Sequence, residues 1–246
     1  MQGSELITRQ FILNENTPFV ITEAYSKIRT NLLAALGDTP YRSIVVTSQC
    51  RSEGKTTTAI NLGLIFSRLD KRVLVIDADL RRSGIHDLLR IKNHFGLSTI
   101  ITRESDIYSG ICVNVRKNFH VMPSGPRAAS PSDLLGSAET ERLVRMLYDY
   151  YDYIIIDTPP LCIANDALLF GGYTGGTTLV LRENKTTHAD LREALSSISL
   201  SQAKFLGIIK THCQAKYDKS SDYRSSLNEN ADSVDDDGEF EDSSEE

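Results

Sequence analysis

The chain has 246 residues, of which 40% are hydrophobic, and this is enough for one α/β domain with its own core and a terminal extension. Residues 229–246 hold ten acidic side chains and no Lys or Arg, so the net charge of -6 divides into an acidic end and a body of +4. No stripe of Lys and Arg forms, which argues against nucleic-acid binding.

The sequence shows neither a targeting signal nor a pair of cysteines at metal-binding spacing. The N-terminus has no positive region followed by an apolar stretch, and no apolar run approaches the roughly 18 to 20 residues of a membrane span. The four cysteines form no CxxC pair, so we expect free thiols in a reducing compartment, at Cys50, Cys112, Cys162 and Cys213. A soluble protein that meets the membrane only through a partner is therefore expected.

Apolar runs rich in β-branched residues alternate along the chain with segments of helical periodicity. Residues 1–16 are polar and are expected to be flexible. The first helix is predicted over residues 21–36, with Thr22 as its N-cap. Buried strands are predicted at residues 43–48, 73–77, 119–125, 153–157, 177–182 and 205–210. Further helices are predicted at residues 54–68, from His86 onward, and at 138–148 and 188–200.

This alternation predicts an α/β fold of the P-loop NTPase type: a doubly wound, mainly parallel sheet with helices on both faces. Strands that are apolar throughout are typical of parallel sheets covered on both sides, and such sheets bind ligands at the carboxyl ends of their strands. Apolar residues almost vanish from Cys213 onward. We therefore expect a domain over residues 17–212 and a disordered acidic tail over residues 213–246.

Residues 45–62, VVTSQCRSEGKTTTAINL, predict a phosphate-binding loop between a buried strand and a helix. Amide groups at a helix N-terminus favour an anion, Lys55 adds a positive charge, and the Thr56 hydroxyl can bind Mg²⁺. Gln49 replaces the first Gly of the usual G-x-x-x-x-G-K-[ST] pattern, but the strand–loop–helix context is retained. ATP is the expected ligand, with the candidate binding residues Ser52, Glu53, Gly54, Lys55, Thr56 and Thr57.

Three carboxylates follow the ends of predicted strands. Asp77 ends the second strand, Asp79 follows two residues later on the same side of an extended chain, and Asp157 ends the fourth. In a parallel sheet they would share the edge that carries the phosphate loop. Together with Thr56 they would make an oxygen site suited to Mg²⁺, and one carboxylate could accept a proton from an attacking hydroxyl.

The chain is similar to the bacterial tyrosine kinases of capsule and exopolysaccharide assembly, from about Glu23 to Lys210. The resemblance rests on an ordered series of motifs: EGKTT, VLVIDADLRRSGIH, GLS at residues 96–98, MPSGPRAASPSDLLGS, IIIDTPP and the Asp166-Ala167 pair. It implies an ATP-dependent autokinase. Asp77 would orient or deprotonate the tyrosine hydroxyl, Asp79 and Asp157 would support the metal, and Arg81, from the same motif, would add local positive charge.

The resemblance also implies partners and a switch. A ring of subunits would form through a helix on which Glu23 and Arg29 match the family pattern, and the C-terminal tail would offer Tyr217 and Tyr223 for autophosphorylation. The chain is similar to the split form of the family, which implies a cytoplasmic protein held at the inner membrane face by a membrane-anchored activator of the chain-length-determinant type. A cognate tyrosine phosphatase would reverse the modification.

Several residues depart from the family pattern. Arg51 and Ser52 stand where Pro-Gly is usual, the last strand ends in Lys210-Thr211 where Asn is usual, and the tail has two tyrosines rather than a cluster. Two other functions therefore stay open. One is a ParA/MinD-like organising ATPase, although Cys50 stands where that group carries an extra Lys. The other is a nucleotide-binding pseudokinase scaffold without phosphoryl transfer.

Overall fold

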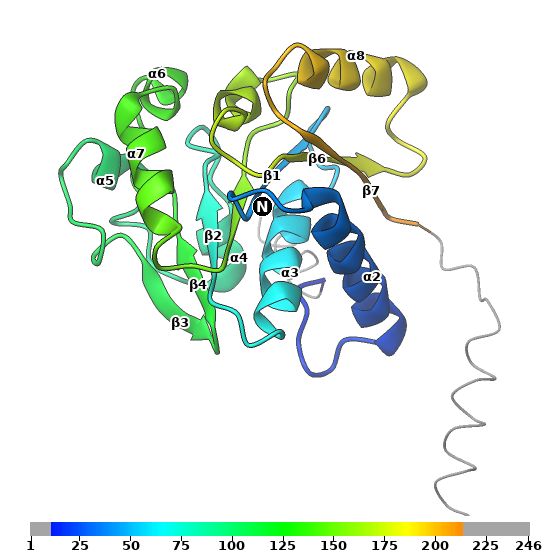
Figure 1. The fold of residues 1–246 in the computed structure, drawn as a ribbon, viewed down its shortest axis with the longest axis horizontal. Coiled ribbons are helices and arrows are strands. Elements are labelled where there is room, and N and C mark those ends of the chain that lie inside the picture. Colours follow the sequence, from blue (N-terminus) through cyan, green and yellow to red (C-terminus); the bar gives the residue numbers. More distant parts are fainter. Residues whose placement is uncertain (1–10, 214–246) are drawn as a thin grey trace, which may run out of the picture. The chain divides into compact units, whose positions relative to one another are not determined.

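The computed structural model describes residues 11–213, which form a seven-stranded sheet in the order β3-β4-β2-β5-β1-β6-β7 (Figure 1). All neighbouring strands are parallel except β3 and β4, which are antiparallel. The predicted fold class is confirmed. The strands are β1 (Ser43–Ser48), β2 (Val73–Asp77), β3 (Cys112–Arg116), β4 (Phe119–Met122), β5 (Tyr153–Asp157), β6 (Thr177–Arg182) and β7 (Phe205–Thr211).

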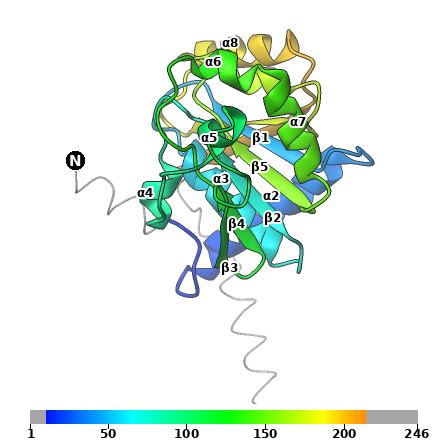
Figure 2. The ribbon, with the colours of Figure 1, turned by 90° about the vertical axis from the view of Figure 1, so that its left-hand side faces the viewer.

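Helices cover both faces of this sheet (Figures 1 and 2). Side chains alternate between two cores along each strand: Val73 and Val75 of β2 pack into one, and Leu74 and Ile76 into the other. The first core lies under α2 (Phe19–Leu36), α3 (Lys55–Ser67) and α4 (Ile85–Leu89). The second lies under α5 (Leu97–Ile101), α6 (Pro131–Leu135), α7 (Ala138–Leu147), the 3-10 helix η1 (Asn165–Phe170) and α8 (His188–Ser199).

The packed structure begins before residue 17, the expected start of the domain. Ile12 and Leu13 are buried, and the Leu13 amide donates a 2.9 Å hydrogen bond to the Asn61 side chain on α3. Residues 11–16 therefore differ from the flexible segment that their polarity suggested. The predicted N-cap is also wrong: α2 starts at Phe19 after Pro18, so Thr22 lies inside the helix.

The sequence pattern did not predict the edge strand β3 or the short helices α5, α6 and η1. No helix within residues 11–213 combines the length and apolar character that crossing a membrane requires. The compact unit ends at His212. The expectations for the tail, including Tyr217 and Tyr223 as modification sites, fall outside the described residues.

Sheet register brings the predicted acidic positions to one edge. Asp77 at the end of β2 is aligned with Asp157 at the end of β5, and Val46 of β1 is aligned with Asp157 from the other side. The loop that leaves β1 therefore emerges beside both carboxylates. The carboxyl edge of the three central strands is the place where the predicted site residues meet.

Candidate active site

The phosphate loop joins β1 to α3 through two residues in the left-handed region of backbone conformation. Ser52 has a φ of 61° and Gly54, the N-cap residue of α3, has a φ of 90°. A left-handed conformation favours glycine, and a side chain with a Cβ there is strained. Ser52, the residue that stands where glycine is usual, therefore occupies a strained position. The first amides of α3 follow directly, and such amides lack partners within their helix.

Glu53 holds the loop in this shape. Its buried carboxylate accepts a 2.7 Å hydrogen bond from the Cys50 amide and another from the Thr186 hydroxyl, while its carbonyl accepts one of 2.7 Å from the Thr211 hydroxyl. Both carboxylate oxygens of Glu53 thus accept hydrogen bonds that fix the shape of the loop. The sequence pattern did not single out Thr186, and it noted Thr211 only as a departure from the family.

Lys55, the first residue of α3, lies between two carboxylates. Its Nζ is 3.2 Å from Oδ2 of Asp79 and 3.5 Å from Oδ1 of Asp157. Burial lowers the pKa of Lys55, but the attraction of Asp157, Asp79 and Asp77 outweighs it and leaves the pKa raised. The ammonium therefore stays charged, and the predicted meeting of these residues at the sheet edge is seen in the structure.

Asp77 is turned into the protein. Its Oδ1 accepts the Asp79 amide at 3.2 Å, and its Oδ2 accepts the amides of Gly84 and Ile85 at the start of α4, both at 3.1 Å. Asp77 thus orders the turn, whereas Asp79 faces Lys55. Burial and then the charge of Asp157 raise the pKa of Asp77 to about 7, despite these amides. A carboxyl with a pKa near 7 is suited to proton exchange.

The donor set at Asp157 fits a magnesium ion that is also bound by phosphate. Within residues 11–213, Oδ2 of Asp157 is buried and has no hydrogen-bond partner, while Thr56 and Lys55 bond to the same side chain. Over that range no group of three or more His, Cys, Asp or Glu residues is arranged to hold a metal. Mg²⁺ typically uses one or two carboxylates together with substrate phosphates, so Thr56, Asp79 and Asp157 suit it only beside a nucleotide.

Arg81 is held by Asp166 and Ser132. Its Nε is 3.4 Å from Oδ2 of Asp166 and its guanidinium donates a 2.7 Å hydrogen bond to Ser132, which in turn donates to Asp166. Asp166 is buried, so the arginine is anchored beside the site. The family pattern contained both partners, Asp166 in the Asp166-Ala167 pair and Ser132 in the MPSGPRAASPSDLLGS motif, but it did not indicate that they contact Arg81.

The two residues proposed for a subunit contact lie on α2. Arg29 donates a 2.9 Å hydrogen bond to the carbonyl of Ile65 in the last turn of α3, and Glu23 is half-buried. Arg29 therefore has a contact inside the subunit as well as its expected role between subunits.

Comparisons with known proteins agree with this geometry. A family model described as an AAA domain matches residues 41–171. The chain is 35% identical to the tyrosine-protein kinase YwqD of Bacillus subtilis (strain 168) over 188 residues, which cover 76% of this chain and 79% of YwqD. Its structure is similar to that of the chimerical protein CapA2B2, with a TM-score of 0.76, 30% identity and coverage of 84% and 89% of the two chains.

The kinase domain of the Escherichia coli tyrosine kinase ETK is similar as well, with a TM-score of 0.74, 27% identity and coverage of 84% and 86%. The residues matched by the family model include the phosphate loop and both acidic strand ends. The chain belongs to the family of bacterial tyrosine-protein kinases, built on the P-loop NTPase-like fold.

Proposed function

We propose that the protein is an ATP-dependent tyrosine autokinase that regulates capsular or exopolysaccharide synthesis. The observation that carries the proposal is the position of Lys55, which stands at the N-terminus of α3 and is held by Asp79 and Asp157. The relatives are tyrosine-protein kinases, so this function fits better than a ParA/MinD-like ATPase. It also fits better than a scaffold without transfer.

The triphosphate of ATP would bind at the loop and the first turn of α3. The helix amides and dipole attract it, and the Lys55 ammonium would move from its carboxylate partners to the outer phosphates. The backbone of residues 52–57 would line the phosphates. Mg²⁺, when bound with the nucleotide by Thr56, Asp79 and Asp157, would neutralise negative charge on the phosphoryl group as it is transferred.

The acceptor would be a tyrosine hydroxyl, with Tyr217 and Tyr223 as the candidates on this chain. Its oxygen forms the new bond to the γ-phosphorus as the bond to the bridging oxygen breaks and ADP leaves. Asp77 would orient the hydroxyl or receive its proton, for which a pKa of about 7 is suitable. Arg81, anchored by Asp166, would contribute positive charge next to the reacting groups.

The proposed assembly is a homo-oligomeric ring at the inner face of the cell membrane. A membrane-anchored activator of the chain-length-determinant type would hold the cytoplasmic kinase there, and a cognate phosphatase would remove phosphate from its tyrosines. Support comes from the similarity to split-form kinases and from the match of Glu23 and Arg29 to the family's contact helix.

Phosphotyrosine formation tests the proposal directly. The full chain is expressed with and without a co-encoded membrane activator and probed with an anti-phosphotyrosine antibody. Lys55→Ala and Asp77→Ala should each abolish the signal, Tyr217→Phe combined with Tyr223→Phe should remove it, and Lys92→Ala, at an exposed lysine, should retain it. ATP hydrolysis without phosphotyrosine in the presence of the activator would favour an organising ATPase and contradict the kinase.

A further inference from the structure

Two cysteines that are far apart in the sequence lie in contact at the phosphate loop. Cys50 follows Gln49, which occupies the first position of the loop pattern, and Cys162 belongs to the segment that leaves β5. The two thiols share a hydrogen bond. Cys162 is exposed and Cys50 is partly buried, so a small solute in solvent reaches at least one member of this thiol pair.

Backbone hydrogen bonds hold the two segments side by side. The Leu161 amide donates to the carbonyl of Ser48 at 2.8 Å, and the Cys162 amide donates to the carbonyl of Gln49 at 3.1 Å. On the loop itself, the Ser48 hydroxyl donates a 2.8 Å hydrogen bond to the carbonyl of Cys50. A disulfide requires two Cα atoms within about 7 Å and side chains that face each other. The main-chain pairing and the thiol contact meet both requirements.

Cys112 cannot make the same bond in the folded chain. It lies on the edge strand β3, which β4 and β2 separate from β5. Since neighbouring strands are about 4.8 Å apart, β3 lies about 14 Å from β5. This is about twice the largest Cα separation that a disulfide spans. Cys112 is therefore a matched control for the thiol pair.

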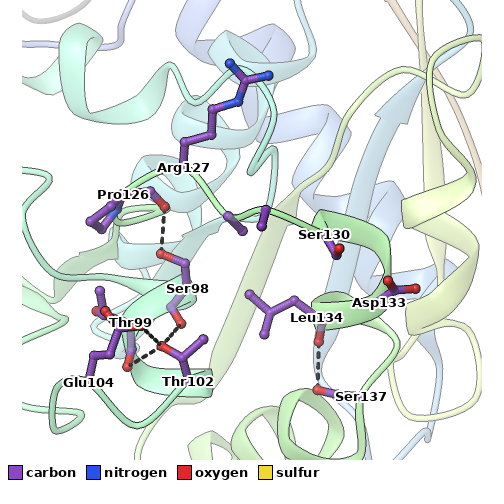
Figure 3. Close-up of a pocket in the computed structure, with 12 residues that line it drawn as sticks. Ser98, Thr99, Thr102, Glu104, Pro126, Arg127, Ser130, Asp133, Leu134 and Ser137 are labelled. Atoms are coloured by element: carbon purple, nitrogen blue, oxygen red, sulfur yellow. Dashed lines mark hydrogen bonds between the residues drawn. The ribbon is translucent and has the colours of Figure 1, made fainter.

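An open hollow of about 610 Å³ lies next to the thiol pair. Arg51 and Ile163, the residues that follow the two cysteines, both line it. Three further arginines line it as well: Arg81, Arg82 and Arg127. In Figure 3 the Arg127 side chain extends away from Ser98 and Leu134, which line a second hollow, so its guanidinium remains available to the first. Guanidinium groups at such a place can stabilise the negative charge of a leaving hydroxide.

We propose that hydrogen peroxide joins Cys50 and Cys162 in a disulfide, which ties the phosphate loop to the segment after β5 and weakens the binding of Mg-ATP. The Cys162 thiolate attacks one peroxide oxygen, the O–O bond breaks, and hydroxide leaves a sulfenic acid on the sulfur. The Cys50 sulfur then attacks that sulfur, and the oxygen leaves as water with the thiol proton. In total, two thiols and one peroxide give one disulfide and two waters. A dithiol reductant restores both thiols by exchange.

The two thiols have different roles in this sequence of steps. Burial, and then the charge of Glu53, raises the pKa of Cys50 to about 11, which makes it a poor partner for peroxide. Its contact with Cys162 gives it a high effective concentration at the sulfenic acid, and this offsets its small thiolate fraction. The exposed Cys162 is therefore oxidised first, and Cys50 completes the bond.

The disulfide would shift the loop that is expected to hold phosphate. Two sulfurs in hydrogen-bond contact must approach to about 2.05 Å when they form a bond. This movement displaces Cys50, and residues 52–57, which would line the phosphates, follow it directly in the chain. A displacement of about 1 Å is enough to weaken interactions that depend on exact placement. This consequence rests on the proposed nucleotide site, whereas formation of the disulfide does not.

Peptide mass spectrometry tests the disulfide without any nucleotide. The full chain is treated with hydrogen peroxide, catalase removes the excess, and free thiols are alkylated. Trypsin then releases residues 43–51 and residues 146–182, which carry the two cysteines. We expect these peptides to be joined after oxidation and separate after treatment with dithiothreitol.

Three variants establish which thiols take part. Cys162→Ser should abolish the joined peptides, whereas Cys112→Ser should retain them. In Cys50→Ser the sulfenic acid has no neighbouring thiol to react with, so dimedone should label Cys162. The disulfide would be contradicted by sulfinic acid at Cys162 while Cys50 stays free, by a link from either cysteine to Cys213, or by a covalent dimer on non-reducing electrophoresis.

Titration with a fluorescent ATP analogue and Mg²⁺ tests the effect on the nucleotide site. Oxidation should raise Kd at least tenfold in the native chain and in Cys112→Ser, and dithiothreitol should reverse the change. In Cys162→Ser the same treatment should change Kd less than twofold. An unchanged Kd in a chain that carries the disulfide would overturn its proposed effect on nucleotide. Absence of binding in the reduced chain would instead contradict the proposed function, because the joined peptides are detected independently.

Discussion

Nζ of Lys55 lies 3.2 Å from Oδ2 of Asp79, so the cation of the phosphate loop is paired with an acidic side chain before any phosphate arrives. Asp157 contacts the same ammonium at 3.5 Å. Phosphate binding must therefore exchange one set of partners for another. The pairing keeps a lysine charged in a place where burial alone would favour its neutral form.

Loss of this lysine should leave two carboxylates without their counter-charge. Removal of one partner from a buried ion pair typically costs about 3 kcal/mol or more. We expect Lys55→Ala to lower the free energy of unfolding of the nucleotide-free protein by about 3 kcal/mol, measured by urea denaturation. Adding Asp157→Asn should recover part of this loss because it removes one of the unpaired charges. Equal stability of Lys55→Ala and the native chain would contradict the pairing.

The strained backbone of Ser52 predicts a substitution that makes the protein more stable. A left-handed conformation destabilises the folded state by about 1–2 kcal/mol when the residue is not glycine. Glycine in turn gives the unfolded chain more conformational entropy, which lowers the free energy of unfolding by about 0.4–1 kcal/mol. Ser52→Gly should therefore raise the free energy of unfolding by about 0.5–1 kcal/mol and Tm by about 1–4 °C, read by thermal denaturation.

Gly54→Ala is the matched control for this prediction. Gly54 has a φ of 90°, and a Cβ there would lie 3.3 Å from the Thr211 side chain, so the variant should be less stable than the native chain. A lower Tm in Ser52→Gly would show that the left-handed backbone at this position carries no strain.

Strands could be predicted from the sequence wherever both faces are buried. The bounds of β1, β2, β5 and β6 agree with the apolar runs because every central strand packs into two cores. The edge strand β3 was not predicted because most of its side chains are exposed and its sequence, CVNVR, has no clear period. The N-cap of α2 was assigned to Thr22 because threonine often caps helices, but Pro18 precedes the helix.

The sequence predicted the part of the site that lies at the ends of parallel strands. Alignment of parallel strand ends brought Lys55, Asp79 and Asp157 together, as the pattern indicated. The inward turn of Asp77 depends on the backbone amides of Asp79, Gly84 and Ile85. The anchoring of Arg81 by Asp166 depends on side chains 85 positions apart. The hydrogen bond from Thr186 to Glu53 likewise joins residues 133 positions apart. No local pattern encodes such pairings.

Arg29 should stabilise the single subunit as well as any ring. Its guanidinium bonds to the carbonyl of Ile65, near the C-terminus of α3, where carbonyls lack helical partners and a cation is favoured. Arg29→Ala should lower the free energy of unfolding by about 1 kcal/mol at concentrations where the protein is monomeric. Glu23→Ala should leave monomer stability unchanged and alter only the subunit association measured by sedimentation velocity. Unchanged monomer stability in Arg29→Ala would restrict that residue to the subunit contact.

Cys50 should be a slow nucleophile although it lies in the phosphate loop. Burial, followed by the charge of Glu53, raises the pKa of its thiol to about 11. Since the thiolate is the reactive form, only about 0.1% of Cys50 is reactive at pH 8. Iodoacetamide should therefore label exposed Cys162 faster than Cys50, as quantified by peptide mass spectrometry, and Cys50 labelling should rise about tenfold per pH unit between pH 7 and 10. In urea the two thiols should react alike, and equal rates in the folded protein at pH 7.5 would show that Glu53 and burial leave the Cys50 thiol unprotected.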